Sequence, residues 1–185
     1  MGREFAVSVG TLLWLVAAGF GFWAWDRYEA TPAPIGPAPV ARARATGSWE
    51  VTLFVHPHCP CARGALAALG DLAREAPALV VRVAFVRPPG APTGWERSAS
   101  WRAAESVPRA SVVCDADGVG ATRAGAATSG VAVLSDPTGR VAFRGGLTPR
   151  PGHGGDAPGA RAVRAWLSGE TGPASAPVFG CPLFD

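Results

Sequence analysis

Residues 51–76 read VTLFVHPHCPCARGALAALGDLAREA, and they carry the strongest structural signal in the chain. The apolar run 51–55 predicts a buried strand, and the Ala- and Leu-rich run that follows the cysteines predicts a helix. The sequence therefore predicts a strand that delivers Cys59 and Cys61 to the N-terminus of a helix. Because unpaired N–H groups and the positive dipole end favour an anion there, we expect the nearer thiol to ionise more readily than a free cysteine.

The one-residue spacing of the two cysteines restricts where each one lies. Residues i and i+2 do not face each other on a helix, so Cys59 is predicted in the loop or cap, with Pro60 at the first helical position. Cys61 then falls in the first turn, and Cys59 is the more accessible thiol. Such a short ring departs from relaxed disulfide geometry, and strained disulfides are the easily reduced ones. The spacing therefore favours a redox couple, with a metal site or inert structural cysteines as the alternatives.

Length and composition set the limits for the rest of the chain. Its 185 residues are 48% hydrophobic, which is enough for one globular domain with appendages. The formal net charge is +3, and the arginines are scattered without interleaved aromatic residues, so we expect no nucleic-acid partner. Four cysteines in a chain with an export-type N-terminus suit an oxidising compartment.

The N-terminal stretch 5–25, FAVSVGTLLWLVAAGFGFWAW, contains no charged residue. It is long enough to span a hydrocarbon core of about 30 Å, and Trp23, Trp25 and Tyr28 cluster at one end as interfacial anchors do. The bulky end of the run does not suit a signal-peptidase site. Residues 1–30 are therefore predicted as an uncleaved, single-pass membrane anchor, with a cleaved signal peptide or a buried core helix as alternatives. The C-terminal domain is expected on the exported side, periplasmic or extracellular.

The chain after the anchor divides by composition into three further parts. Residues 31–48 are rich in Pro, Ala and Arg, which predicts an extended, semi-rigid linker. Residues 49–170 are predicted to form the folded domain. Residues 171–185 are predicted as a tail whose apolar residues pack back on that domain.

Within the domain, apolar runs and breakers alternate in a pattern typical of α/β architecture. Strands separated by helical segments imply parallel pairing, whereas the Asp-Pro-Thr-Gly turn at 136–139 predicts a hairpin between the last two strands. We expect strands at residues 50–56, 79–86, 110–114, 131–135 and 140–144, and helices at residues 60–76, 95–107, 118–126 and 157–168.

This pattern resembles the thioredoxin fold, and more specifically its membrane-anchored, exported TlpA/ResA-like branch. The sequence Asp-Ala-Asp-Gly at 115–118 is similar to the D-x-D-G before an extra helix in that branch, and 136–141 is similar to its D-x-x-G-x-V hairpin. A further set of motifs resembles a RedB-like group: HPHCPC at 56–61, TSG at 128–130, FRGG at 143–146, GHGGD at 152–156 and FGCP at 179–182. The resemblance implies a mixed sheet with a terminal hairpin, flanked by helices. It also implies a thiol–disulfide oxidoreductase that acts on the thiols or disulfides of partner proteins without a cofactor.

The chain departs from the thioredoxin pattern at two places. Thioredoxins have two residues between the cysteines and a Trp before the first, whereas here Pro60 alone intervenes and His58 precedes. They also carry a cis-proline before the first hairpin strand, which docks the backbone of the substrate. The matching residues here are Thr128, Ser129 and Gly130, which the resemblance implies as substrate-binding residues.

The candidate catalytic residues follow from the cysteine pair and its neighbour. Cys59 is predicted as the attacking thiolate and Cys61 as the resolving thiol, with His58 stabilising the thiolate or relaying a proton. The other two cysteines leave two alternatives open. Cys181 is expected either to pair in a structural disulfide with Cys114, which is otherwise a small core residue at the end of its strand, or to approach the Cys-Pro-Cys pair as a resolving thiol.

A copper- or zinc-binding or delivery domain of the same fold is the rival hypothesis, because thiolates and imidazoles are ligands for both metals. The two histidines before the cysteines alternate along a strand end, so they are expected to point to opposite sides. One intervening residue is also tight for two tetrahedral positions. The candidate ligands are His56, His58, Cys59, Cys61 and His153.

Overall fold

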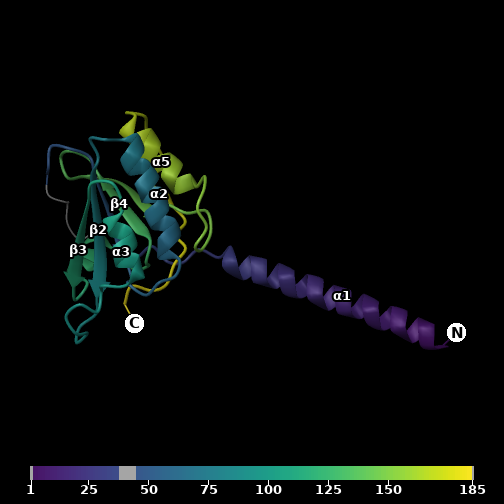
Figure 1. The fold of residues 1–185 in the computed structure, drawn as a ribbon. Helices are drawn as coiled ribbons and strands as arrows, with labels where there is room; N and C mark the ends of the chain where they lie inside the picture. Colours follow the sequence, from purple (N-terminus) through teal and green to yellow (C-terminus); the bar gives the residue numbers. More distant parts are fainter. Residues whose placement is uncertain (1, 38–44, 185) are drawn as a thin grey trace. The chain divides into compact units, whose positions relative to one another are not determined.

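The computed structural model describes residues 2–37 and 45–184, so residues 38–44 of the predicted linker lie outside the described residues. The chain divides into two compact units, Met1–Thr31 and Pro32–Asp185. The first unit holds the helix α1 (Gly2–Glu29) (Figure 1). Its part Val7–Glu29 has a mean hydropathy of 1.7 and is nowhere buried, so it is long and apolar enough to cross a membrane. A signal sequence near the N-terminus can meet the same criteria of length and hydropathy.

The second unit is built on one six-stranded sheet with the strand order β3-β2-β1-β4-β5-β6. The strands β1, β2 and β3 run parallel, whereas β4 is antiparallel to both β1 and β5. This mixed sheet with a terminal hairpin, flanked by helices, confirms the α/β class and the thioredoxin-like fold expected from the sequence. The strands are β1 (Glu50–Val55), β2 (Val80–Arg87), β3 (Ala110–Ala116), β4 (Val131–Ser135), β5 (Val141–Gly146) and β6 (Ser175–Ala176).

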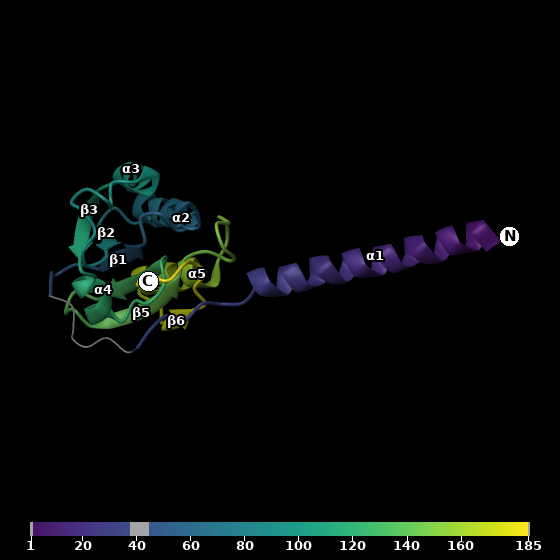
Figure 2. The ribbon, with the colours of Figure 1, turned by 90° about the horizontal axis from the view of Figure 1, so that it is seen from below.

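Helices lie on both faces of the sheet, with α2 and α3 on one side and α4 on the other in Figure 2. The larger core lies under α2, α3 and α5, where Leu53 and Phe85 of the sheet pack with Leu69, Trp101 and Val163 of the three helices. Burial of these large apolar side chains is the main force that holds the layers together. The helices are α2 (Ala62–Glu75), α3 (Ala99–Glu105), α4 (Val119–Ala124) and α5 (Pro158–Leu167).

A smaller core on the opposite face is closed by chain segments from both ends of the unit. Phe54 and Val133 of the sheet pack there with Ala121 of α4. Leu183, near the C-terminus, belongs to this core and is 1% exposed. Ile35 packs against the same cluster. Residues from the beginning and the end of the unit therefore meet on one face of the sheet.

Part of the segment interpreted as a linker, 31–48, is hydrogen-bonded to the folded unit. The backbone N–H of Ala33 donates to the carbonyl of Val178 at 2.9 Å. The hydroxyl of Thr128 donates to the carbonyl of Pro34 at 2.6 Å. These bonds place the described start of the segment directly beside the C-terminal tail.

The start of α3 differs from the sequence-based expectation because an N-cap residue determines where the helix begins. We expected a helix from residue 95, but α3 begins at Ala99 because the Ser98 hydroxyl accepts the N–H of Trp101 at 3.3 Å. A serine in this role satisfies one of the free N–H groups at a helix start. The two-residue strand β6 was not predicted, because it is too short to carry a periodic pattern.

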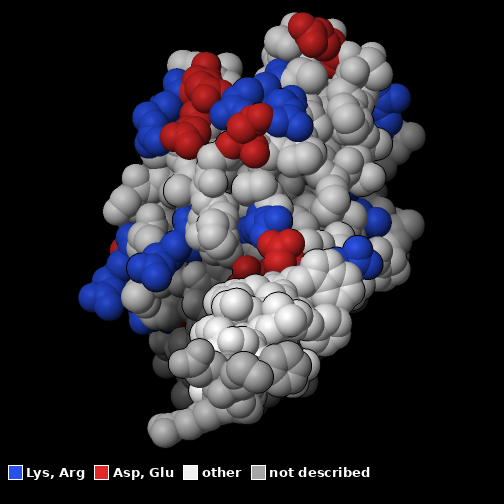
Figure 3. Space-filling view, turned by 90° about the vertical axis from the view of Figure 1, so that its right-hand side faces the viewer, with Lys and Arg blue, Asp and Glu red and all other residues white. Residues whose placement is uncertain are grey.

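Charged side chains of both signs are interspersed on the face of the molecule shown in Figure 3. Ion pairs in the described part of the chain include Arg164 with Glu75 at 2.6 Å and Arg82 with Glu50 at 3.2 Å. Such exposed pairs contribute little to stability. Their effect is to neutralise the surface locally.

Candidate active site

The Cys-Pro-Cys sequence forms the turn between β1 and α2. The backbone N–H of Cys59 donates to the carbonyl of His56 at 3.0 Å, and the N–H of Ala62 donates to the carbonyl of Cys59 at 3.2 Å. Cys61 is the N-cap residue of α2. Pro60 therefore lies in the turn and not at the first helical position, because the helix begins two residues later than we expected.

The exposure of the two thiols is the reverse of the prediction. Cys59 is 1% exposed, whereas Cys61 is half-buried. The C-terminal tail lies over Cys59 and brings Cys181 into hydrogen-bonding contact with it. Local sequence around the pair gives no signal of this cover, because the covering residues lie at the other end of the chain.

Hydrogen-bond donors around Cys59 favour its thiolate form. Burial by itself raises the pKa of the Cys59 thiol. The opposing effect comes from hydrogen bonds with the backbone N–H and the thiol of Cys181, the hydroxyl of Ser129 and the backbone of Cys61. These bonds outweigh burial, so the pKa of Cys59 lies below its ordinary value. The sequence predicted this direction, but it located the cause in the helix N-terminus and in His58, whereas the lowering comes from Cys181, Ser129 and Cys61.

Ser129 joins three parts of the site. It is 1% exposed, and its Oγ accepts the backbone N–H of His56 at 3.0 Å while its hydroxyl is hydrogen-bonded to Cys59. Its own backbone N–H donates to the carbonyl of Cys181 at 2.8 Å. The loop 128–130, which the resemblance implies as substrate-binding, therefore lies beside Cys59. In this structure the backbone N–H of Ser129, which could pair with a substrate, is bonded to the tail instead.

The two histidines lie on the same side, against Trp95. The ring centroids of His58 and Trp95 are 4.7 Å apart, and those of His56 and Trp95 are 5.5 Å apart. The expectation that the histidines point to opposite sides is wrong, because β1 ends before His56 and the alternation of a strand does not continue through the turn. The backbone N–H of His58 donates to Nδ1 of His56 at 3.3 Å, so that nitrogen carries no proton in this arrangement. Trp95 was missed as a site residue, because it was interpreted as the start of a helix.

A cavity of about 260 Å³ opens beside the cysteine turn. Its volume is below that of most small-molecule sites, and it suits a single side chain of a bound peptide. Arg63, which is exposed, lines one side of this cavity. The full lining consists of Pro57, His58, Cys59, Pro60, Arg63, Ser98, Ala99 and Ser100.

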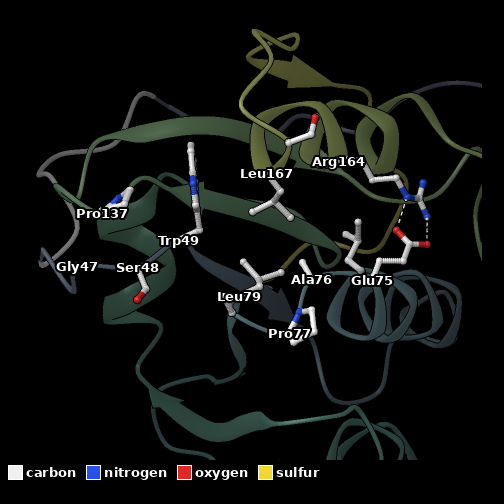
Figure 4. A pocket seen from close by; sticks show the side chains of 13 residues that line it. Gly47, Ser48, Trp49, Glu75, Ala76, Pro77, Leu79, Pro137, Arg164 and Leu167 are labelled. Carbon is white, nitrogen blue, oxygen red and sulfur yellow. Dashed lines mark hydrogen bonds and ion pairs between the residues drawn. The ribbon is translucent and has the colours of Figure 1, made fainter.

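A larger cavity of about 700 Å³ lies beside Trp49, at the opposite end of β1 from the cysteines, and Figure 4 shows the residues that line it. Trp49, Leu79 and Leu167 form apolar walls, and the ion pair between Arg164 and Glu75 lies at one side. The described residues that line it include neither a cysteine nor a histidine. Its size alone does not make it the reaction centre, so we place the candidate chemistry at the smaller cavity.

Cys114 lies on β3, next to Glu96 and Arg87. Burial raises the pKa of the Cys114 thiol, and the carboxylate of Glu96, itself 5% exposed, raises it further. A thiol in such surroundings is a weak nucleophile. No disulfide joins the four cysteines, each of which lies in the described part of the chain. Of the two alternatives left open, the arrangement favours the approach of Cys181 to the Cys-Pro-Cys pair.

The loop that carries His153 packs against the start of α2. A Cβ atom built on Gly64 would lie 3.1 Å from the carbonyl oxygen of His153, and Nδ1 of the His153 ring lies 2.8 Å from the carbonyl of Pro151. Over residues 2–37 and 45–184, no group of three or more His, Cys, Asp or Glu side chains is arranged to hold a metal ion. The copper or zinc hypothesis therefore gains no support from the placement of its five candidate ligands.

Comparison with known proteins adds information about the fold. No protein-family model matches the chain, and no curated protein sequence matches it either. The chain is similar to a conserved uncharacterized protein from Geobacillus kaustophilus, with 19% identity, coverage of 82% of this chain and 92% of that one, and a TM-score of 0.61. It is also similar to a hypothetical protein from Sinorhizobium meliloti, with 22% identity, coverage of 83% and 95%, and a TM-score of 0.58. These similarities describe a shared fold, so the reaction has to be argued from the site.

Proposed function

We propose that this chain is a thiol–disulfide oxidoreductase that uses Cys59 and Cys61 on the disulfides of partner proteins. The observation that supports it is the Cys59 thiol, whose pKa is lowered by hydrogen bonds at the end of β1. The thiolate is the species that attacks a disulfide. A second thiol, Cys61, follows after one residue and is more exposed, so it is available to resolve a mixed disulfide.

The reaction proceeds in two exchange steps. The Cys59 thiolate attacks one sulfur of the partner disulfide; a bond forms between Cys59 and the partner, and the other partner sulfur leaves as a thiolate and takes up a proton. Cys61 then attacks Sγ of Cys59, so the Cys59–Cys61 disulfide forms and the second partner sulfur leaves. Two thiols of this chain are oxidised and one partner disulfide is reduced to two thiols. The reverse order of steps oxidises a partner dithiol. We further propose that His58, which lines the adjoining cavity, exchanges protons with the leaving thiolates.

Trapping of the mixed disulfide tests this function. In a Cys61→Ser/Cys181→Ser variant neither neighbouring thiol can displace a partner, so covalent complexes through Cys59 are expected to accumulate on nonreducing gels. Adding Cys59→Ser to the same variant should abolish them, whereas adding Cys114→Ser should leave their yield unchanged. A Cys59 thiol that forms no adduct with any disulfide, including glutathione disulfide, would exclude the proposed reaction.

Membrane anchoring is the second part of the proposal. The helix α1, which carries no charged residue at 5–25 and is nowhere buried over Val7–Glu29, supports a single-pass anchor, and the placement of the domain on the exported side follows the sequence-based expectation. Exported proteins would then be the partners. Alkaline carbonate extraction should leave the protein in the membrane fraction, and protease added from the exported side should digest the domain. Release by carbonate, or a domain that stays protected, contradicts this topology.

A further inference from the structure

The C-terminal tail crosses the loop before β4 as a short antiparallel strand. The backbone N–H of Ser129 donates to the carbonyl of Cys181 at 2.8 Å, and the N–H of Leu183 donates to the carbonyl of Ala127 at 2.9 Å. The residues between these two pairs form an antiparallel bridge. The tail is therefore positioned by backbone pairing of the kind that an added peptide strand uses.

Two close contacts fix the register of this strand. A Cβ atom on Gly180 would lie 2.0 Å from the carbonyl oxygen of Ser129, so only glycine fits there without movement of the tail. The Leu183 side chain, 1% exposed, fills the smaller core. These contacts fix the position of Cys181 between them.

The register places Cys181 at the nucleophile of the proposed reaction. Its backbone N–H and its thiol both form hydrogen bonds with Cys59, which is 1% exposed. Ser129, which pairs with the tail, contacts the same sulfur. Cys59, the thiol that has to react with a partner protein, is therefore already in contact with Cys181 of its own chain.

We propose that Cys181 is a third redox-active cysteine and that the tail acts as a tethered substrate strand, so that the oxidised protein carries a Cys59–Cys181 disulfide. This inference rests on the proposed function. The step is an internal exchange: the Cys181 thiolate attacks Sγ of Cys59 in the Cys59–Cys61 disulfide, the Cys59–Cys181 bond forms, and Cys61 leaves as a thiolate that takes up the proton given by Cys181. One disulfide and one thiol are present before and after, so no external oxidant or reductant is needed.

Geometry favours the product of this exchange. A Cys59–Cys61 disulfide closes a ring with one residue between the cysteines, which departs from relaxed disulfide geometry. Cys181 already lies within hydrogen-bonding reach of Cys59, and the paired strand holds it there. Exchange to Cys181 therefore releases strain without unfolding any element.

The same geometry defines the class of partner. A partner cysteine reaches the buried Cys59 only where the tail now lies, so the partner has to present its cysteine on an extended segment that pairs with residues 127–129. The tail then leaves this loop when a partner binds. Oxidation to the Cys59–Cys181 form closes the site against partners that lack such a segment.

Disulfide mapping of the full chain tests the inference. Trypsin leaves Cys59 and Cys61 on one peptide, 45–63, and Cys181 on another, 165–185. After equilibration with glutathione disulfide, acid quenching and alkylation, we expect these two peptides to be linked in the wild type and in Cys61→Ser. Gly180→Ala, which forces the tail off Ser129, should lose the link and gain the bond within peptide 45–63. Gly180→Ala should also raise the alkylation rate of Cys59 by about tenfold or more over the wild type, which corresponds to about 1.4 kcal/mol. The two rates are compared at a pH at which Cys59 is fully ionised in both proteins.

A matched glycine substitution separates this effect from general perturbation. Gly70→Ala, in α2, meets only the Arg74 side chain at 3.6 Å and should keep the wild-type link. Wild-type protein that yields only the bond within peptide 45–63 overturns the tail proposal and leaves the oxidoreductase function standing. A protein in which no cysteine exchanges with glutathione disulfide overturns both proposals.

Discussion

Replacement of Ser129 by alanine tests how the site activates its thiol. The Ser129 hydroxyl is hydrogen-bonded to Cys59 and accepts the N–H of His56 at 3.0 Å, and the residue is 1% exposed. A hydrogen bond to a charged group is worth about 1.5–3 kcal/mol, against about 0.5–1.5 kcal/mol for a neutral one. The difference, about 1–1.5 kcal/mol, is the extra stabilisation that the hydroxyl gives the thiolate over the thiol. At 1.36 kcal/mol per pKa unit, its loss in Ser129→Ala should raise the Cys59 pKa by about one unit.

The substitution also changes stability, and its pH dependence has a defined sign. Alanine leaves the half-buried N–H of His56 without this acceptor, which costs about 1–3 kcal/mol. The pKa of Cys59 in the folded protein is lowered, so its thiolate contributes stability that is fully present above the pKa of the unfolded thiol, about 8.5. That contribution is lost as pH falls through the folded pKa. The reduced wild type should therefore gain stability as pH rises through this window, and Ser129→Ala should gain less.

The pH dependence of alkylation by iodoacetamide reports the Cys59 pKa. It is measured in a Cys61→Ser background, so that the label on peptide 45–63 comes from Cys59 alone. Denaturant unfolding of the reduced protein at several pH values reports the linked stability. Ser135→Ala is the matched control, because Ser135 is also buried but lies at the other end of β4. An unchanged Cys59 pKa in folded Ser129→Ala would refute the assignment of Ser129 as a donor to the thiolate.

Three further predictions concern other parts of the molecule. Arg144 donates to the carbonyls of Gly125 at 2.9 Å and Gly36 at 3.4 Å, so Arg144→Ala should lower the free energy of unfolding by about 1–3 kcal/mol. It should also speed proteolysis within residues 32–37, and an unchanged cleavage rate would contradict this role. Because the lowered pKa of Cys59 stabilises the reduced protein, glutathione equilibration should give a potential of about −230 to −120 mV, and a value near −270 mV would contradict this. Protein purified without oxygen should carry no stoichiometric copper or zinc, and metal that is lost in Cys59→Ser would restore the metal hypothesis.

The order of elements could be predicted because it is encoded in local patterns. The apolar run 131–135 coincides with β4, and the cysteines do lie between β1 and α2. The hairpin turn was equally visible, since the Asp136 carboxylate accepts the N–H groups of Thr138 at 2.9 Å and Arg140 at 3.0 Å, as its turn sequence implies. Such features depend on residues that are close in the sequence.

The details of the site could not be predicted because they depend on residues from distant parts of the chain. The tail that covers Cys59 and the segment 32–37 beside it are positioned by hydrogen bonds to backbone carbonyls, which every residue carries. Hydrophobic periodicity carries no information about such contacts. The accessibility of Cys59 was therefore predicted wrongly, whereas the direction of its pKa shift was predicted for an incomplete reason.

The absence of a proline before β4 and the presence of a cysteine in the tail have one physical explanation in this structure. A proline at position 129 would have no N–H to donate to the carbonyl of Cys181 and no hydroxyl to bond to Cys59. Serine provides both, and it also accepts the N–H of His56. The residue that holds the tail is therefore the residue that stabilises the thiolate, so a partner that displaces the tail removes the hydrogen bonds from Cys181 while that from Ser129 remains. Loss of the Cys181 hydrogen bonds raises the pKa of Cys59, whereas loss of the burial that the tail imposes lowers it. Because the hydrogen bonds outweigh burial in the closed site, we expect Cys59 to be less acidic in the open site, yet still more acidic than a free cysteine. A Gly180→Ala variant whose Cys59 pKa equals that of the wild type would contradict this coupling.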